Sequence, residues 1–540
     1  MHDVDVVVIG SGAGGLNAAT ALARAGQKVL VLEQHNLPGG WCQSFTSDGH
    51  RWTPGLHSAG ELEPGRPLRR LYEGQGVGAD LTFYRTPDSG HDHFVFGQNR
   101  FAFVKGKEQL IEKLAREFTT ERAGIAAYVD YIDGMTDQVM TVEEADGVLD
   151  LCSIPFRSPR VVKWAAKTGQ QLVDSFVKAP RLRAILNGQC LAHGLPPSQV
   201  SALVHASVTA HYLRGGFYPK GGGGAIVAAL IKSMRRAGGE IKVRSNVERI
   251  LLEGKRAVGV RLSDGTEIRS RFVVSNADPT VTFAKLIGPA HLPAKLAAKV
   301  AGTKYSASSV MLSLVTDLDV RAAGFDGSSY WCFENEDVEG ACRATLDPKV
   351  IEREQIPAFF LAVSSLKDPS KTANGNHTIA ANVVVPYEAF ARWADTRHGE
   401  RPREYEELKA KLSARVIAAL EKHMPGIGAH VLHSELATPL TIGHYLANTN
   451  GNIYGTAKSP DQIGFKGYLV RTPFTGLMLC GASTWGHGLH SCSYSGLAAA
   501  SAILGCRNRD LLRADNGAIT LLSGTTAEAA SAAPAAVAPT

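Results

Sequence analysis

The chain of 540 residues and 57.5 kDa is 44% hydrophobic and 20% charged, with a mean hydropathy of −0.06. This composition excludes a disordered or collagen-like protein, and the length predicts two domains or one elaborated α/β architecture. The net charge of +6 is spread over a long chain and does not indicate nucleic-acid binding. Eight cysteines without a CxxC pair or zinc-like spacing predict reduced thiols, no metal site and a cytoplasmic protein.

The start of the chain predicts a βαβ unit. Val4–Ile9 is an apolar run with the character of a strand, residues 10–15 form a glycine loop, residues 16–25 have helical spacing, and residues 28–32 predict a second strand. This order of elements is that of the first nucleotide-binding unit in Rossmann-type folds.

The glycine loop, Gly10-Ser11-Gly12-Ala13-Gly14-Gly15, satisfies the GxGxxG pattern. Gly10 can make the tight turn, Gly12 can admit a pyrophosphate, and Gly15 can let helix and strand pack closely, while the helix N-terminus attracts phosphates. Glu33 ends the second strand, where an acid accepts hydrogen bonds from ribose hydroxyls and disfavours the 2′-phosphate of NADP. The start of the chain therefore predicts a dinucleotide site.

A pair of glycines after Glu33 favours FAD over NAD. Gly39 and Gly40 allow the backbone to approach an extended cofactor, which a simple NAD domain does not require; a generic surface turn is the alternative. The glycines of residues 221–224 also precede a helical pattern, but they follow residues 218–220, which we interpret as a loop. We expect no second nucleotide site, and the electron acceptor stays open among oxygen, a quinone, another protein and the substrate.

The rest of the chain predicts interleaved domains. Helical spacing dominates residues 106–183, and a small antiparallel meander is expected over residues 241–276. Three β-like runs, residues 309–315, 358–363 and 378–385, predict a second sheet, and residues 405–422 predict a charged amphipathic helix. We predict a FAD-binding domain from residues 1–105, 215–290 and 440–515, a substrate and membrane-associated domain from residues 106–214 and 291–439, and a disordered tail at residues 516–540.

Two uncharged runs, residues 6–23 and 472–506, are interrupted by glycines, and we do not interpret them as membrane-spanning helices. Residues 152–183 carry seven basic side chains and one acid among aromatic and aliphatic residues. This pattern suits either the surface of an anionic bilayer or a solvated basic helix that packs its apolar stripe on its own domain. We therefore expect peripheral contact with the inner face of a membrane as one of two possibilities.

Four long segments resemble the phytoene desaturase, carotenoid isomerase and retinol saturase family of flavoproteins. They are DVVVIGSGAGGLNAATALARAGQKVLVLEQHNLPGG, GGFYPKGGGGAIVAALIKSMRRAGGEI, FVVSNADP and GLMLCGASTWGHGLHSCSYSGLAAASAIL, and the similarity extends from Val4 to Leu504. It implies noncovalent FAD and an α/β fold in which a Rossmann-type FAD-binding domain is interleaved with an α+β substrate domain of the amine-oxidase and phytoene-desaturase type. It also implies an oxidoreductase that acts on carbon–carbon bonds of an apolar polyene or isoprenoid by desaturation, saturation or cis–trans isomerisation.

The resemblance implies cofactor contacts at fourteen positions: Gly10, Gly12, Ala13, Gly14, Gly15, Glu33, Gln34, Gly39, Gly40, Val247, Gly481, Ala482, Gly488 and Leu489. Residues 495–503 have helical character, so their helix N-terminus is expected to stabilise negative charge on a reduced flavin. The candidates for polar catalytic groups near the flavin ring are His490, His487, His57 and Tyr494, each close in sequence to an expected flavin loop. The loop before His490 lacks the proline that many desaturases of the family carry, which leaves the reaction direction open.

Two other functions stay possible at this stage. An amine-oxidase-like flavoenzyme would need an aromatic cage, for which Trp41, Trp331, Tyr445 and Trp485 are candidates. A flavin-bound interaction protein without turnover is the third possibility.

Overall fold

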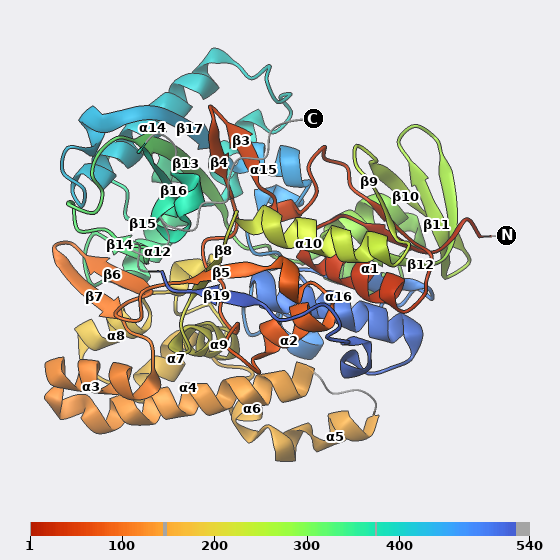
Figure 1. The fold of residues 1–540 in the computed structure, drawn as a ribbon, viewed down its shortest axis with the longest axis horizontal. Coiled ribbons are helices and arrows are strands. Elements are labelled where there is room, and N and C mark those ends of the chain that lie inside the picture. The colour runs from red at the N-terminus through yellow and green to blue at the C-terminus, as the bar shows by residue number, and fades with distance from the viewer. Residues whose placement is uncertain (1, 144–147, 373–374, 525–540) are drawn as a thin grey trace.

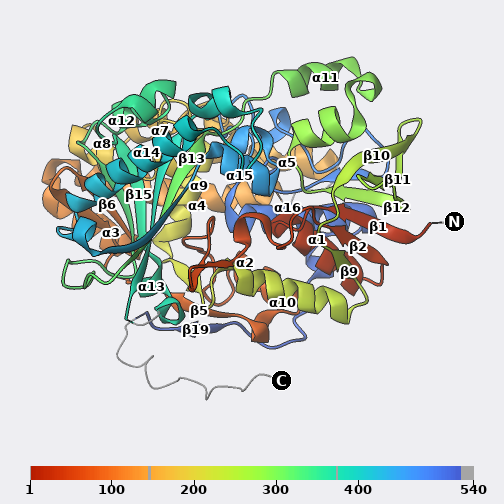
Figure 2. The ribbon, with the colours of Figure 1, turned by 90° about the horizontal axis from the view of Figure 1, so that it is seen from above.

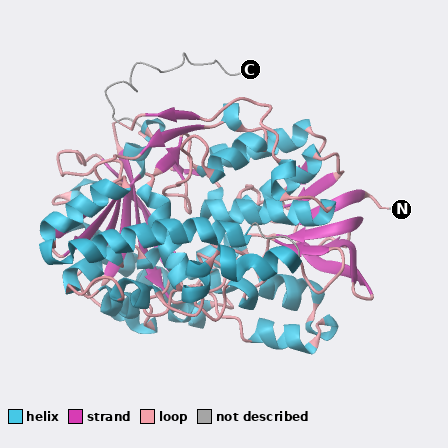
Figure 3. Cartoon of the chain, turned by 90° about the horizontal axis from the view of Figure 1, so that it is seen from below, coloured by secondary structure: helices cyan, strands magenta, loops and turns pink. Residues whose placement is uncertain are grey.

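The computed structural model describes residues 2–143, 148–372 and 375–524. Two large sheets stand at opposite ends of the molecule, with most of the helices between and around them (Figure 1, Figure 3). All eight cysteines lie within the described residues and are free.

The first sheet contains the two strands of the predicted βαβ unit together with strands from the middle and the end of the chain. Its parallel part runs β18-β12-β1-β2-β9, with β1 Val4–Ile9, β2 Val29–Leu32, β9 Glu240–Lys242, β12 Glu267–Ser275 and β18 Leu477–Leu479. The antiparallel strands β10 Val247–Glu253 and β11 Arg256–Leu262 extend it through β12. The predicted βαβ unit and the meander are thereby confirmed.

Alternation along β1 gives the first sheet two buried faces. Val6 and Val8 pack into one core, while Val7 and Ile9 pack into another. The first face is covered by α1 Ala13–Arg24, α10 Gly223–Arg236 and α16 Gly488–Leu504, which lie side by side in Figure 1. The second face is covered by the π-helix at Thr280–Ile287.

The second sheet has the order β17-β13-β16-β15-β14-β6-β7, in which only β14 and β6 are parallel neighbours among the described strands. Its strands are β6 Asp92–Phe96, β7 Asn99–Phe103, β13 Ser308–Thr316, β14 Ser329–Phe333, β15 Ala358–Val363, β16 His377–Val385 and β17 Val431–Ala437. The second sheet predicted from residues 309–315, 358–363 and 378–385 is confirmed.

Each face of the second sheet has its own core. In β15, Phe360 and Ala362 face one core, whereas Phe359 and Leu361 face the other. The second core includes α14 Arg403–Glu421, the predicted charged helix. The first core is shared with a helical layer: α3 Lys107–Glu117, α4 Arg122–Glu143, α6 Pro159–Trp164, α7 Gly169–Asp174, α8 Pro180–Leu186 and α9 Ala202–Leu213. Next to this layer, α5 Val148–Arg157 contacts α4 and α6. No helix in the described part of the chain is long and apolar enough to cross a bilayer.

The remaining elements are short. They are β3 Phe45–Ser47, β4 His50–Trp52, α2 Pro67–Gly74, β5 Thr82–Arg85, β8 Phe217–Pro219, α11 Ala294–Ala301, α12 Val338–Thr345, α13 Ser364–Lys367, α15 Pro439–Leu446 and β19 Thr520–Leu522.

Three expectations are corrected by strand pairing between distant segments. β19 pairs with β5, so the residues of β19, which fall within the predicted disordered tail, form a strand; residues 525–540 of that tail lie outside the described residues. β8 also pairs with β5, so the residues before the second glycine cluster are a strand rather than a loop. β6 and β7 belong to the second sheet although they fall within residues 1–105, because β6 pairs in parallel with β14.

Candidate active site

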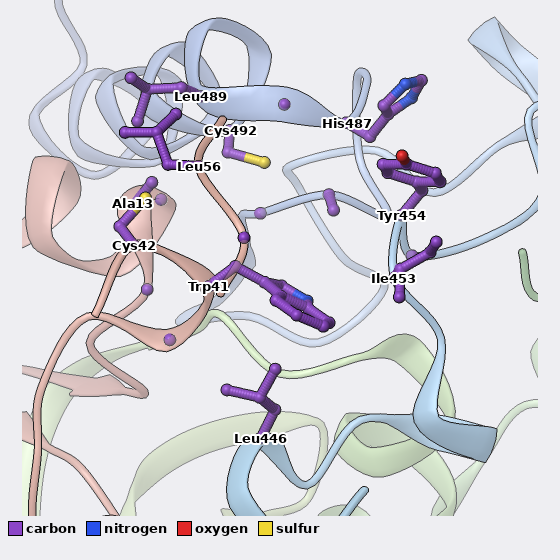
Figure 4. A pocket seen from close by; sticks show the side chains of 18 of the residues that line it. Ala13, Trp41, Cys42, Leu56, Leu446, Ile453, Tyr454, His487, Leu489 and Cys492 are labelled. Atoms are coloured by element: carbon purple, nitrogen blue, oxygen red, sulfur yellow. The ribbon is translucent and has the colours of Figure 1, made fainter. Parts of the chain in front are cut away.

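A cavity of about 520 Å³ is lined by residues of both sheets. Figure 2 shows how the two sheets stand apart in the fold. The cavity extends from the β1–α1 loop to the face of the second sheet, and its volume is typical of a ligand site. Figure 4 shows one region of it: Tyr454, His487 and Ile453 lie on one side, Leu56, Leu489 and Cys42 on the other, and Trp41 points between them.

The glycine loop forms a cradle that no larger residue could form. A Cβ at Gly12 would lie 2.6 Å from Asn276 Nδ2, and a Cβ at Gly14 would lie 2.6 Å from Asn276 Oδ1 and 2.8 Å from the Gly481 nitrogen. A Cβ at Gly15 would collide with the Gly10 carbonyl, which confirms the predicted close packing of helix and strand. Gly12 and Gly14 both line the cavity, and Asn276 and Gly481 occupy the space that a side chain at these positions would need.

Asn276 organises this cradle, although the sequence analysis gave it no role. Its Oδ1 accepts a hydrogen bond from the Gly15 nitrogen at 3.1 Å, and it lines the cavity directly after β12. The signal that could have found it is its position, because polar residues at the carboxyl ends of neighbouring parallel strands meet at one edge of the sheet.

Glu33 lines the cavity at the end of β2, where an acid for ribose was predicted. Its Oε2 accepts from the Ser11 nitrogen at 2.9 Å and from Ser11 Oγ at 2.6 Å, and its Oε1 accepts from the His35 nitrogen at 2.9 Å. Each carboxylate oxygen can accept more than one hydrogen bond, so the Oε1 edge keeps capacity for a hydroxyl. Ser11, whose Oγ also accepts from the Gly39 nitrogen, was not singled out by the sequence.

Twelve of the fourteen predicted cofactor residues line the cavity: Gly10, Gly12, Ala13, Gly14, Glu33, Gln34, Gly40, Val247, Gly481, Ala482, Gly488 and Leu489. Gly15 and Gly39 do not. Gly15 lies beneath the loop against Gly10, and a Cβ at Gly39 would lie 2.6 Å from Val227, so both glycines serve packing around the cavity.

The late helix begins earlier than expected. α16 starts at Gly488, not at residue 495, because Gly488 adopts a φ of +82° and turns the chain directly into the helix. The N-terminal turn of α16, with its free backbone N–H groups, therefore lies in the cavity wall.

His487 and Tyr454 form one wall pair, with ring centroids 4.8 Å apart (Figure 4). Burial, with the nearby Lys458 ammonium, lowers the pKa of His487 to about 3, and burial also raises the pKa of Tyr454. At neutral pH the histidine is uncharged and the tyrosine keeps its proton.

His490 and His57 line other parts of the cavity. Burial, with His211 nearby, lowers the pKa of His490 to about 3, and burial with Lys367 and Lys371 lowers that of His57 to about 3. All three predicted histidines are therefore neutral in this cavity.

Tyr494 is placed elsewhere. Its side chain is buried in the core beneath α16, its hydroxyl donates to the Pro67 carbonyl at 3.1 Å, and it does not line the cavity. The structure brings His57, His487 and His490 to the cavity but gives Tyr494 a packing position.

Asp278 and Lys458 form a buried polar cluster beside Ala482 that the sequence analysis missed. Asp278 accepts from the Thr449 nitrogen at 2.7 Å, and burial raises its pKa despite that hydrogen bond. Lys458 Nζ donates to the Ala482 carbonyl at 2.6 Å, and burial lowers its pKa to about 8. This cluster fixes the backbone that follows β18.

Residues 13–504 match the family described as flavin containing amine oxidoreductase. The chain belongs to this family. It is an FAD-dependent oxidoreductase with a Rossmann-type FAD-binding fold. The glycine loop that lines the cavity, the acid at the end of β2 and the α16 N-terminus are a donor and acceptor set that fits FAD.

The chain is less than 30% identical to the individual relatives compared with it. The chain is 28% identical over 534 residues to all-trans-retinol 13,14-reductase of Homo sapiens, covering 93% of this chain and 85% of the relative. It is 27% identical over 508 residues to the chloroplastic prolycopene isomerase of Arabidopsis thaliana, covering 91% and 81%. The crystal structure of an oxidoreductase from Methanosarcina mazei superimposes with a TM-score of 0.63 at 18% identity, covering 92% and 99%, and supports the fold.

Two of the four candidate rings for an amine-binding cage, Tyr445 and Trp331, pack against different parts of the cavity wall. Trp41, Trp331 and Tyr445 line the cavity, but Trp485 does not. The ring centroids of Tyr445 and His35, near Glu33, are 5.2 Å apart in an edge-on arrangement, whereas those of Trp331 and Phe360 on the second sheet are 4.8 Å apart. Among the described residues, groups of three or more His, Cys, Asp or Glu placed to hold a metal ion are absent.

Proposed function

We propose that this flavoenzyme reduces or isomerises a carbon–carbon double bond of a retinoid or carotenoid polyene. The observation that carries the proposal is the continuity of one cavity from the glycine cradle to an apolar wall on the second sheet. The names of the two curated relatives, a retinol reductase and a prolycopene isomerase, support the same substrate class. In this proposal residues of the first sheet hold FAD and those of the second sheet and the helical layer hold the substrate.

The wall beyond the cradle is suited to an elongated apolar molecule. It contains Leu56, Val139, Met140, Leu191, Val208, Met311, Phe360, Val384 and Ile453. Burying a polyene against such side chains is favourable by about 25 cal/mol per Å² of apolar surface removed from water. These side chains also exclude water from the region between the cradle and the sheet.

Bound FAD supplies hydride exchange with carbon. The protein groups around it keep fixed protonation states: His57, His487 and His490 are neutral, and Tyr454 retains its phenolic proton. In a reduction, we assign the delivery of the required proton to the hydroxyl of Tyr454, which lines the cavity next to His487. An isomerisation needs no net proton.

Anaerobic mixing tests this function. Photoreduced enzyme is mixed with all-trans-retinol or prolycopene, and the lipid extract is analysed for mass and chromatographic retention. A gain of two hydrogens with return of the oxidised flavin spectrum identifies reduction, and an unchanged mass with altered retention identifies isomerisation. Bleaching of the oxidised enzyme by an amine, or no change with any of these compounds, would refute the proposal in favour of an amine oxidase or a protein without turnover.

We also propose that α5 and α6 contact an anionic membrane from which the substrate is taken. The two helices lie at the lower edge of Figure 1. Phe156 is 87% exposed and Val162 is 50% exposed, and each is followed in the chain by a basic residue, Arg157 and Lys163. Val161 and Trp164 are buried, so part of the apolar stripe packs on the domain and part faces outward. Exposed apolar side chains flanked by cations suit the interface of an anionic bilayer.

Vesicle sedimentation tests this surface. Phe156→Ala should reduce co-sedimentation with phosphatidylserine vesicles several-fold, because it removes the aromatic ring that would insert into the bilayer interface. Phe465→Ala is the matched control, because Phe465 is 67% exposed in a different segment, the 3-10 helix Gly464–Lys466. Equal sedimentation of the wild type and Phe156→Ala would refute the proposal.

A further inference from the structure

The wall of the cavity on the second sheet carries polar side chains within an apolar face. Asp92, Ser329 and Asn382 lie on the same face as Phe94, Trp331 and Val384. Ser329 and Asp92 are direct partners across β14 and β6, and Asn382 is the partner of Phe360, which is in turn the partner of Trp331. The neighbouring strands β16, β15, β14 and β6 therefore bring these polar groups together on one face of the sheet.

Two of the groups are held from behind by other side chains. Gln189 Nε2 donates to Asp92 Oδ2 at 2.7 Å, and Lys367 Nζ donates to Ser329 Oγ at 2.6 Å. An ammonium group can only donate, so Ser329 acts as the acceptor and its own hydroxyl hydrogen stays available. Asp92, Ser329, Gln189 and Lys367 are each less than 5% exposed.

Two further polar atoms in this wall have no partner among the described residues. They are Trp331 Nε1, a donor, and Asn382 Oδ1, an acceptor. The Asn382 amide nitrogen lies 3.1 Å from His57 Nε2, and the neutral His57 ring also hydrogen-bonds the Pro54 carbonyl. A neutral imidazole has one N–H, which serves that carbonyl, so Asn382 donates its amide and leaves Oδ1 free.

We propose that this wall is a subsite for a hydroxyl group at one end of the substrate, with Trp331 and Asn382 as its specificity-determining residues. The inference rests on the proposed function and narrows it to polyene alcohols.

The mixture of free donors and acceptors selects the hydroxyl. A hydroxyl both accepts and donates, so it can satisfy Trp331 Nε1 or Ser329 and at the same time Asn382 Oδ1 or Asp92. A hydrocarbon end would leave these groups unpaired in a buried wall, which is costly. A carboxylate can only accept and would place its charge beside the carboxyl of Asp92. A site built in this way discriminates strongly against an analogue that lacks the hydroxyl.

The test compares two ligands on FAD-loaded protein. The dissociation constants of all-trans-retinol and of the hydrocarbon with the same skeleton but no oxygen are measured by quenching of protein fluorescence. Trp331→Phe keeps an aromatic ring against Phe360 and removes the indole N–H together with part of the ring system, so the preference for the alcohol should fall about tenfold. Asn382→Leu should reduce the preference as well, which guards against poor folding of a single variant.

Trp393→Phe is the matched control. It also removes an indole N–H, but Trp393 lies in the core on the opposite face of the second sheet, so the preference should equal that of the wild type. An unchanged preference in both Trp331→Phe and Asn382→Leu would overturn the subsite while leaving the proposed function intact. If the FAD-loaded wild type binds neither polyene, the proposed function itself fails.

Discussion

Gly496 in α16 lies directly against the backbone of Gly14 in α1, although 482 residues separate them in the chain. A Cβ at Gly496 would collide with the Gly14 carbonyl oxygen and would stand 3.0 Å from the Ala18 nitrogen. The two helices can therefore cross this closely only while residue 496 is glycine. The crossing joins the early glycine loop to the late flavin loop.

Replacing Gly496 should separate the two loops. Gly496→Ala forces a methyl group into backbone that cannot move aside, and we expect a loss of about 3 kcal/mol in the free energy of unfolding. Flavin occupancy, measured as the ratio of absorbance at the flavin band to that of the protein, should fall with it. Gly302→Ala is the control, since its Cβ would be 3.4 Å from the nearest atom and φ is negative. Full stability and occupancy in Gly496→Ala would contradict the crossing described here.

Glu33→Ala should weaken FAD binding without unfolding the protein. The substitution removes the acceptor for a ribose hydroxyl and the partner of Ser11, so the dissociation constant for FAD should rise by roughly 30-fold. Isothermal titration of apoprotein measures this directly. Glu240→Ala, an exposed acid on the neighbouring strand β9, should leave the affinity unchanged, and a variant of Glu33 that purifies fully loaded would show that the ribose assignment is wrong.

Tyr454→Phe separates reduction from isomerisation. If the hydroxyl supplies a proton, single-turnover reduction of the polyene should slow by about 100-fold, while FAD occupancy and ligand affinity stay the same. Phenylalanine retains the packing against His487. An isomerising enzyme would show the same rate in both proteins, and a reductase with an unaltered rate would exclude Tyr454 as the donor. His490→Ala should likewise preserve occupancy while altering turnover.

Buried histidines make stability fall in acid. Burial holds the pKa of His193 well below its usual value and lowers that of His205 to about 4, whereas an unfolded histidine titrates near 6.5. Between pH 6.5 and about 4 the unfolded chain binds protons that the folded protein does not. The free energy of unfolding should therefore drop as pH falls through this window, by up to about 1.4 kcal/mol per pH unit for each such group, and should not change from this cause above it.

Urea unfolding at pH 7.0, 5.5 and 4.5 measures the slope. His193→Leu removes one of the titrating groups and should flatten the decline, whereas His291→Leu, at an exposed position, should not. Equal slopes in the wild type and His193→Leu would show that this ring is protonated in the folded protein.

The parts of the fold that local patterns determine were predictable from the sequence. Val4–Ile9 and Ala358–Val363 alternate or run apolar over their whole length, and both strands occur with the expected bounds. The cofactor cradle was equally accessible, because a glycine loop between strand and helix has few structural alternatives. Pairings between distant segments were not predictable: nothing near Thr520–Leu522 or Phe217–Pro219 indicates that both join β5.

The polar residues of the site show the same limit. Asn276 and Asp278 lie in a segment that the resemblance singled out, yet their roles depend on Gly15 and Thr449, far away in the chain. His57 meets Asn382 across 325 residues, and no spacing rule links the two. Tyr494 was selected for its nearness in sequence to the flavin loop, but the helical phase of α16 turns it into the core.

The close crossing of α1 and α16 also bears on biosynthesis. The cradle needs Gly481 and Gly496 beside Gly14, so a ribosome must translate nearly the entire chain before the flavin has a complete receptor. FAD can therefore bind only late in synthesis, after α16 has been made. Until then the glycine loop between β1 and α1 is exposed to solvent.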